Sequence, residues 1–368
     1  MGQLFFNGAD YYASLIDGIT RAKSSIDLET YTLDFDDIGL TILDALKKSS
    51  QKGVKIRLLI DGFGSRKSVQ KIKTHLLGSG VQVHVFNPVS FTCLILLRKG
   101  VSTLNKRNHR KVCIVDSHFA WIGSFNISNV HVPLSSHGGG WRDSALKMTS
   151  SEVDLSPLHL AFHQAWATRP LRRSHRFRML RKANRAHSSS RTLLLNWNGS
   201  LRRKRNSKLT EQIKRATQRV WIMSPYFSPN HQLRHALKNA ALRGLDVRIL
   251  LPKAPDVAGM GWVNEVFSGA LSRYGVKIFQ YQPSVLHAKT VIVDHWALLG
   301  SANFNHRSLL YDLEVDVVIH DSKLLRELEL KTIEDFRSSK AMPALKMGQK
   351  RWWKRALDTI PYALRKLT

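Results

Sequence analysis

The feature that most constrains the fold of this chain is an internal repeat. Residues 45–60 and 236–251 both begin with Ala-Leu-Lys, and a glycine follows eight residues later, at Gly53 and Gly244. Each copy predicts a helix that ends near the glycine, followed by a short apolar strand of the kind buried in parallel sheets. Flanking strands are expected at 26–33, 80–86, 220–227 and 275–281. Because strands alternate with helices, the sequence predicts an α/β protein of two similar halves, each a mixed or parallel sheet flanked by helices.

The chemically reactive side chains also occur twice. The sequence HRKVCIVD runs from His109 to Asp116, and HAKTVIVD runs from His287 to Asp294. A Gly-Ser-x-Asn motif follows each copy, after six intervening residues in the first and five in the second, which predicts a shorter hairpin in the second half. A lone histidine is usually structural, but a matched pair at equivalent points of a repeat indicates a duplicated catalytic unit.

The spacing within each motif suits the cleavage of a phosphodiester. His109 and Lys111, like His287 and Lys289, are two residues apart, so on a strand both side chains point to one face. An imidazole can then act as nucleophile while the neighbouring ammonium group neutralises phosphate charge in place of a metal ion. Two facing half-sites provide one histidine for attack and one to protonate the leaving oxygen, so no metal or cofactor is expected. Hydroxyl and amide donors for the phosphoryl oxygens are expected from Ser124, Asn126, Ser301 and Asn303.

These motifs resemble those of the phospholipase D superfamily. The resemblance implies two phospholipase D-like halves packed about a pseudo-twofold axis, with one shared active site and a phosphohistidine intermediate. It also implies that Asp116 and Asp294, although part of the catalytic motifs, mainly support the structure. Separate carboxylates are implied to orient the two histidines, and the residues that match them here are Asp143 and Glu314.

Further stretches resemble bacterial cardiolipin synthases, most closely the B form, which lacks amino-terminal transmembrane hairpins. These stretches lie at 7–12, 28–31, 59–65, 294–297, 314–321 and 351–353. The resemblance implies a phosphatidyltransferase in which His109 attacks one phosphatidylglycerol while His287 protonates the departing glycerol. His287 would then deprotonate a second phosphatidylglycerol, whose hydroxyl displaces the histidine to give cardiolipin. With pseudo-symmetric halves, the two histidine roles could also be exchanged.

The charge of the chain favours a polyanionic partner. There are 57 basic and 27 acidic residues, which gives a formal net charge of +30. Such a charge suits an anionic membrane surface or nucleic acid. The sequence has no apolar stretch of 18 residues and no signal-peptide pattern at its start, so any membrane contact is expected to be peripheral. With only Cys93 and Cys113, a reducing cytoplasm is the simplest compartment. Together with this, the resemblance to bacterial cardiolipin synthases implies a place at the cytoplasmic face of the bacterial inner membrane.

The two halves differ in one place. From Pro283 to His287 there are four steps, whereas from Pro88 to His109 there are 21, so the first half carries an insertion of 17 residues. Residues 91–99 within it are an apolar run ended by Arg and Lys, either a buried element or a lid that dips into the membrane. The predicted division is therefore a first half at 1–168, a basic linker at 169–191, a second half at 192–340 and a basic, aromatic tail at 341–368. The tail suits either a membrane interface or a packed helix.

Three other functions remain open from the sequence. A hydrolytic phospholipase D would use the same residues with water as acceptor. A phospholipase D-type nuclease would also suit the basic charge, although small nucleases of this type usually carry one motif and dimerise. A non-catalytic adaptor would not require the intact His and Lys of both motifs.

Overall fold

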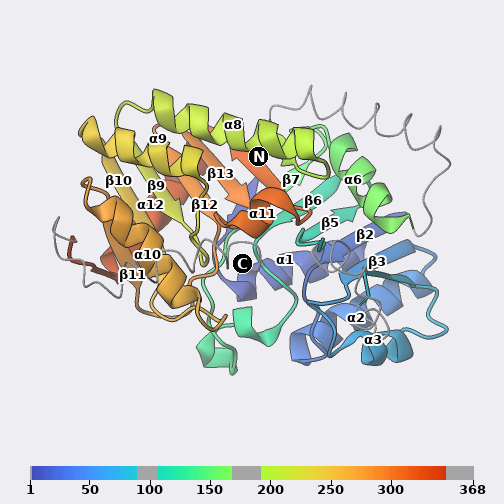
Figure 1. Ribbon diagram of the computed structural model, residues 1–368. Helices are drawn as coiled ribbons and strands as arrows, with labels where there is room; N and C mark the ends of the chain where they lie inside the picture. Colours follow the sequence, from blue (N-terminus) through green and yellow to red (C-terminus); the bar gives the residue numbers. More distant parts are fainter. Residues whose placement is uncertain (1, 89–105, 168–191, 345–368) are drawn as a thin grey trace, which may run out of the picture.

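Two similar sheets make up most of the protein (Figure 1). The computed structural model describes residues 2–88, 106–167 and 192–344. The first half contains β1 (Gln3–Phe5), α1 (Gly8–Arg21), β2 (Ser25–Thr30), α2 (Asp37–Gln51), β3 (Lys55–Asp61), α3 (Val69–His75), β4 (Gln82–Phe86), β5 (Val112–Val115), β6 (Phe119–Gly123), the 3-10 turns η1 (Asn129–His131) and η2 (Leu134–Ser136), β7 (Ala145–Thr149) and α6 (Ser156–Trp166).

The second half repeats this order with few changes. It contains β8 (Leu193–Leu195), α8 (Gly199–Arg215), β9 (Arg219–Met223), α9 (His231–Leu242), β10 (Asp246–Pro252), α10 (Met260–Ser272), β11 (Lys277–Tyr281), β12 (Thr290–Val293), β13 (Trp296–Gly300), α11 (His306–Leu310), β14 (Val315–Ile319), α12 (Ser322–Arg337) and β15 (Ser339–Ala341). Equivalent helices begin at equivalent caps: the side chains of Asn7 and Asn198 accept N–H groups in the first turns of α1 and α8.

The topology confirms the duplication expected from the sequence. The first sheet has the strand order β1-β7-β6-β5-β2-β3-β4, and the second β15-β11-β10-β9-β12-β13-β14-β8. In each sheet three strands are parallel, β2-β3-β4 and β9-β10-β11, and the hairpin strands that follow the histidine run antiparallel to them. Both sheets are therefore mixed, as predicted.

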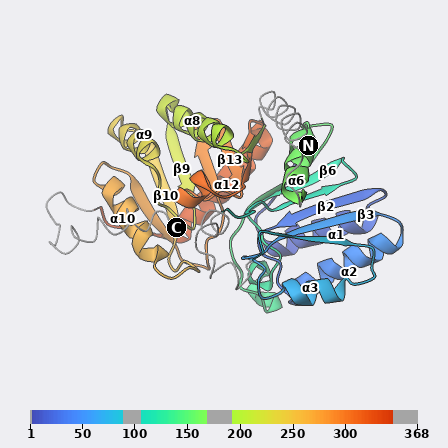
Figure 2. The ribbon, with the colours of Figure 1, turned by 45° about the vertical axis from the view of Figure 1, so that its right-hand side comes forward.

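The two sheets pack against each other and carry helices on their outer faces. One apolar core contains residues from both sheets together with α6 and α12. A second core lies between the first sheet and helices α1 and α2, and a third between the second sheet and helices α8, α9 and α10. Figure 2 shows the two sheets facing one another with these helices outside. Residues at the ends of strands from both halves can therefore meet at one edge of the paired sheets.

The difference in motif spacing lies in a hairpin turn. Val115 pairs with Phe119, which leaves three residues in the turn between β5 and β6, whereas Val293 pairs with Trp296 and leaves two between β12 and β13. The strands after the turn remain equivalent, because Ser124 and Ser301 both donate their backbone N–H to the start of the next strand, at Ser144 and Val315. Ser301 is thus placed like Ser124 despite the shorter hairpin.

Asp116 and Asp294 occupy these hairpin turns, at the opposite end of β5 and β12 from the histidines. The carboxylate of Asp116 accepts backbone N–H groups from Lys23, Ser24 and Ser25 at 2.7–2.9 Å. The carboxylate of Asp294 accepts those of residues 217–219 at 2.8–3.0 Å. Although burial acts in the other direction, these donors lower the pKa of both carboxyl groups. Each aspartate therefore ties the hairpin to the start of the central parallel strand.

Some expectations fall on residues outside the described part of the chain. These are the apolar run at 91–99, the basic linker at 169–191 and nearly all of the tail. The tail was predicted to begin at residue 341, which is the last residue of β15. A run of basic residues at 202–205, just after the linker, lies on α8. Among the described residues, no helix combines the length and the apolar character needed to cross a membrane.

We expect Asp116→Asn and Asp294→Asn to lower stability while activity per folded molecule is retained. Asparagine keeps the shape and tolerates the positive φ of 53° and 47° at these sites, but it places an amino group against N–H donors. The expected loss is about 1–2 kcal/mol of unfolding free energy at pH 7, measured in urea. Because the folded pKa is lowered, this difference should shrink as the pH falls below the ordinary carboxyl value. A fall in kcat at unchanged stability would contradict a structural role.

Candidate active site

The two histidine motifs meet where each half pairs with the other. The backbone N–H of His109 donates to the carbonyl of Leu313 at 2.9 Å, immediately before Glu314. In the same way, the N–H of His287 donates to the carbonyl of Arg142 at 2.8 Å, immediately before Asp143. Each histidine is thereby placed beside the carboxylate of the opposite half, so neither half forms a complete site alone.

Each imidazole uses Nδ1 for a carboxylate across the interface. Nδ1 of His109 lies 3.1 Å from both carboxylate oxygens of Glu314 and 3.1 Å from the carbonyl oxygen of Ser301. Nδ1 of His287 lies 2.8 Å from Oδ1 of Asp143. A carbonyl oxygen can only accept, so the proton of neutral His109 sits on Nδ1 and the Nε2 lone pair is left for a substrate. All four side chains are buried.

Two lysines give the site its positive charge. Nζ of Lys111 donates to the carbonyl of His109 at 2.8 Å, and Nζ of Lys289 donates to that of His287 at 2.6 Å. Burial and repulsion by Lys289 lower the pKa of Lys111 to about 7, and burial lowers the pKa of Lys289 to about 8. An anionic phosphodiester bound between them would restore their ordinary preference for the charged form.

The two supporting carboxylates differ in charge state. Burial raises the pKa of Glu314 to about 7. Asp143 is equally buried, but its contacts with His287 and His131 hold its pKa well below the ordinary value. Burial and the charges of Lys111 and Lys289 also lower the pKa of His109 well below its ordinary value, whereas that of His287 falls to about 4 because Asp143 partly offsets burial. At neutral pH, His287 therefore faces a full negative charge and His109 a partial one.

The Gly-Ser-x-Asn residues line the same interface. Both serine hydroxyls accept the N–H of the residue after a carboxylate, Ser144 for Ser124 and Val315 for Ser301, at 3.0 Å each. Ser301 also donates to Glu314 at 2.5 Å. The backbone N–H groups of Asn126 and Asn303 donate to His131 and Ser308, and the side-chain oxygen of Asn303 is buried without a hydrogen bond among the described residues. Their binding of phosphoryl oxygens stays a prediction.

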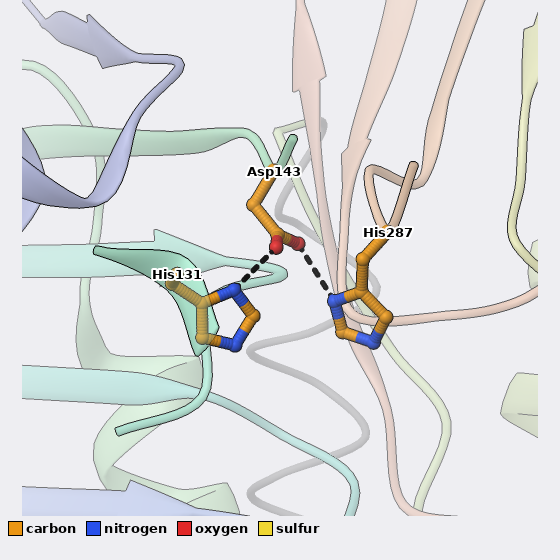
Figure 3. Close-up of side chains that lie close together, drawn as sticks. All are labelled: His131, Asp143 and His287. Carbon is orange, nitrogen blue, oxygen red and sulfur yellow. Dashed lines mark hydrogen bonds and ion pairs between the residues drawn. The ribbon is translucent and has the colours of Figure 1, made fainter. Parts of the chain in front are cut away.

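Several residues of the site were not foreseen from the motifs. The ring of Tyr31 lies 4.8 Å from that of His109 and 5.2 Å from Nζ of Lys111. Arg307 contacts Asp312, whose pKa burial raises to about 7, and Arg307 contributes positive charge near His109. His131 contacts Asp143 together with His287 (Figure 3). In the repeat, position 131 is equivalent to Ser308, and because the two residues differ the sequence gives no signal for His131.

Comparisons with known proteins agree with this arrangement. A family model for the phospholipase D-like domain of cardiolipin synthase matches residues 15–135 and 209–335. Cardiolipin synthase 2 of Bacillus anthracis is 30% identical over 356 residues, which cover 96% of this chain and 68% of that protein. The cardiolipin synthase of Listeria welshimeri is also 30% identical, over 96% of this chain and 72% of that protein.

Two solved structures share the fold. Phosphatidylserine synthase of Haemophilus influenzae superposes with a TM-score of 0.72 at 16% identity, over 100% of this chain and 94% of that one. Polyphosphate kinase of Porphyromonas gingivalis gives a TM-score of 0.59 at 13% identity, over 100% of this chain and 56% of that one. The duplicated fold, the paired motifs and the matching family model together show that this chain belongs to the cardiolipin synthase family of phospholipase D-like proteins.

Proposed function

We propose that this protein is a cardiolipin synthase, which transfers a phosphatidyl group from one phosphatidylglycerol to another and releases glycerol. The observation that carries the proposal is the single buried site in which His109 and His287 are each held by a carboxylate of the opposite half. The two lysines beside them supply positive charge for a phosphodiester. The family relationship supports the choice of lipid substrate.

The first step forms a covalent intermediate. Nε2 of His109 attacks the phosphorus of phosphatidylglycerol, and the bond from phosphorus to the glycerol oxygen breaks. His287 gives its proton to that oxygen, so glycerol leaves neutral. This division of roles follows from the carboxylates: the ionised Asp143 favours a protonated His287 once the anionic substrate is bound. His109 has the lowered pKa that a neutral nucleophile needs.

The second step transfers the phosphatidyl group. The hydroxyl of a second phosphatidylglycerol gives its proton to His287 and attacks the phosphorus, and the bond to His109 breaks. In both steps Lys111 and Lys289 stabilise the negative charge on the phosphoryl oxygens. Burial of all four side chains limits the access of water to the intermediate, which favours transfer over hydrolysis.

An anionic membrane surface is the partner that supplies these lipids, and four exposed apolar side chains support it. They lie on the connections and short helices that follow the strands at the edge of the sheets that carries the histidines: Phe63 (44% exposed), Leu134 (67%), Val257 (47%) and Leu310 (42%). Phe63 follows β3 as Val257 follows β10, and Leu134 and Leu310 both follow a Gly-Ser-x-Asn motif. The chain as a whole carries a net charge of +30, so this edge suits a negatively charged leaflet. We place that leaflet at the cytoplasmic face of the bacterial inner membrane.

The histidine roles can be separated with a lipid whose leaving group needs no proton. With phosphatidyl-p-nitrophenol, we expect His287→Ala to release one equivalent of nitrophenolate per protein and then stop, because the base for the second step is missing. His109→Ala should release none. With phosphatidylglycerol, the unaltered protein should yield cardiolipin and glycerol. The reverse pattern would exchange the two roles, and phosphatidic acid without cardiolipin, or cleavage of DNA alone, would contradict the proposed transfer.

The lysines predict how activity depends on pH. In the free enzyme the pKa values of Lys111 and Lys289 are about 7 and 8, so kcat/KM should fall as the pH rises above about 7 and more steeply above about 8. An anionic lipid raises both pKa values, and kcat, which reports the bound state, should fall only at higher pH. Profiles of the two parameters over pH 5 to 10 test this. Coincident alkaline limbs would show that the lysines do not bind the phosphoryl group.

Membrane contact can be tested at the apolar edge. Replacing Phe63 and Val257 together by Ser should weaken binding to phosphatidylglycerol vesicles about tenfold or more, because two apolar side chains no longer leave water. The double variant Leu77→Ser, Leu242→Ser is a matched control, since both leucines are exposed at the opposite edge of the sheets. Sedimentation with vesicles measures the affinity. Equal binding by the two double variants would remove this edge as the docking surface.

A further inference from the structure

One buried histidine near the active site has no part in the reaction described above. His131 is 1% exposed and lies at the end of η1. Its ring centroid lies 5.6 Å from those of Phe125 and His287 and 5.5 Å from that of Trp141. Figure 3 shows its imidazole and that of His287 on either side of Asp143. The packing leaves His131 no freedom to turn away.

Asp143 receives one imidazole on each oxygen. Oδ1 lies 2.8 Å from Nδ1 of His287, and Oδ2 lies 2.7 Å from Nδ1 of His131. The second contact has the distance of a hydrogen bond, although its angles depart from the ideal. On the far side of the ring, Nε2 of His131 accepts the backbone N–H of Asn126 at 3.3 Å. Because Nε2 accepts, the proton of neutral His131 is on Nδ1, the ring nitrogen beside Asp143.

In the second half a different residue supports the carboxylate that contacts the catalytic histidine. His131 comes seven residues after Ser124, and Ser308 comes seven residues after Ser301. Ser308 likewise accepts a backbone N–H, that of Asn303 at 3.3 Å, and its hydroxyl stabilises the charge on Glu314. Where the carboxylate is the longer glutamate, its partner is the short serine. Where the carboxylate is the shorter aspartate, its partner is the long histidine.

We propose that His131 is a positioning residue that holds the carboxylate of Asp143 against His287, and thereby commits His287 to proton transfer. This inference rests on the proposed function, in which His287 is the acid and then the base. Asp143 meets two N–H donors, whereas Glu314 meets hydroxyl groups and one imidazole. The two histidines are therefore unequal although their motifs are alike.

Other charged or titratable groups around Asp143 do not replace His131. Contact with His287 and His131 lowers the pKa of Asp143. The further titratable groups that interact with it include Tyr11, Tyr12, Tyr226, Lys111 and Lys289. The guanidinium of Arg142 donates to the backbone carbonyl of Asp143 and is paired with Asp335. Burial raises the pKa of the three tyrosines, so they stay neutral. Both lysines act on both carboxylates, so they do not by themselves distinguish Asp143 from Glu314.

The same three side chains are the donors that a divalent cation would need, since their ligand atoms lie within 4.8 Å of one another. Their spacing favours hydrogen bonds instead. Ligands of a tetrahedral zinc ion sit about 2 Å from the metal and hence more than about 3 Å apart. The contacts of 2.7 and 2.8 Å are too short for that arrangement.

A matched pair of variants separates the two contacts of His131. Asparagine places a side-chain N–H near the position of Nδ1, so His131→Asn keeps a donor for Asp143. Glutamine places its terminal group near the position of Nε2, so His131→Gln keeps only a partner for the N–H of Asn126. We expect His131→Gln to lower kcat for phosphatidylglycerol about 10- to 100-fold with little change in KM, and His131→Asn to retain most of it.

Two further measurements show whether His131 acts through His287. Nitrophenolate release from phosphatidyl-p-nitrophenol in the first turnover should be nearly unchanged in His131→Gln, because that leaving group needs no acid. Without the contact from His131 the pKa of Asp143 rises, so the acid limb of kcat should move to higher pH. If the proposed function is wrong, the unaltered protein will not convert phosphatidylglycerol into cardiolipin. The ratio of variant to unaltered activity still tests the role of His131, because it can be measured with any phosphodiester that the protein cleaves.

Three results would overturn the inference. The first is a His131→Gln protein with unchanged kcat and acid limb. The second is an equal loss in both variants and with both substrates, accompanied by a lower Tm, which would make His131 only a packing residue. The third is activity that disappears on treatment with a chelator and returns with zinc, which would assign the three side chains to a metal site.

Discussion

The cross-half contact between a histidine and a carboxylate is the interaction on which this site depends. Glu314 reaches His109 from the second half, and Asp143 reaches His287 from the first. A buried carboxylate is costly without partners, so each half is complete only when the other is in place. The buried ion pair between Arg142 and Asp335, at 2.8 Å, links the halves beside Asp143. The site is thus complete only when the two halves are packed together.

The two copies of the motif are alike in sequence and unlike in electrostatics. Both histidines use Nδ1 for a carboxylate and both lysines donate to the carbonyl of the histidine two residues earlier. The difference arises behind them, where Asp143 is held by a second imidazole while Glu314 is held by serine hydroxyls and titrates near neutrality. With such a difference each histidine has its own role, whereas in two identical half-sites either histidine could be the nucleophile or the proton donor.

Much of the fold could be predicted because it is repeated. A helix, a glycine and an apolar strand at constant offset predicted two α/β halves, and the mixed sheets confirm them. The match of residue types around His109 and His287 was enough to pair the motifs. His131 was missed because position 131 differs between the repeats, and only the three-dimensional contact with Asp143 reveals what it touches. Tyr31 was missed because its proximity to His109 depends on how β2 pairs with β5, which no local pattern encodes.

The pairing of Asp143 with His131, and of Glu314 with Ser308, has a consequence for the history of the molecule. In a symmetric dimer of a single half, every substitution would appear at both sites, and neither subunit could acquire a histidine without the other. One continuous chain removes this restriction. Each half is then free to change its own carboxylate and its own supporting residue. A site that began with twofold symmetry can thereby give its two histidines different roles, while the two halves keep the same backbone fold.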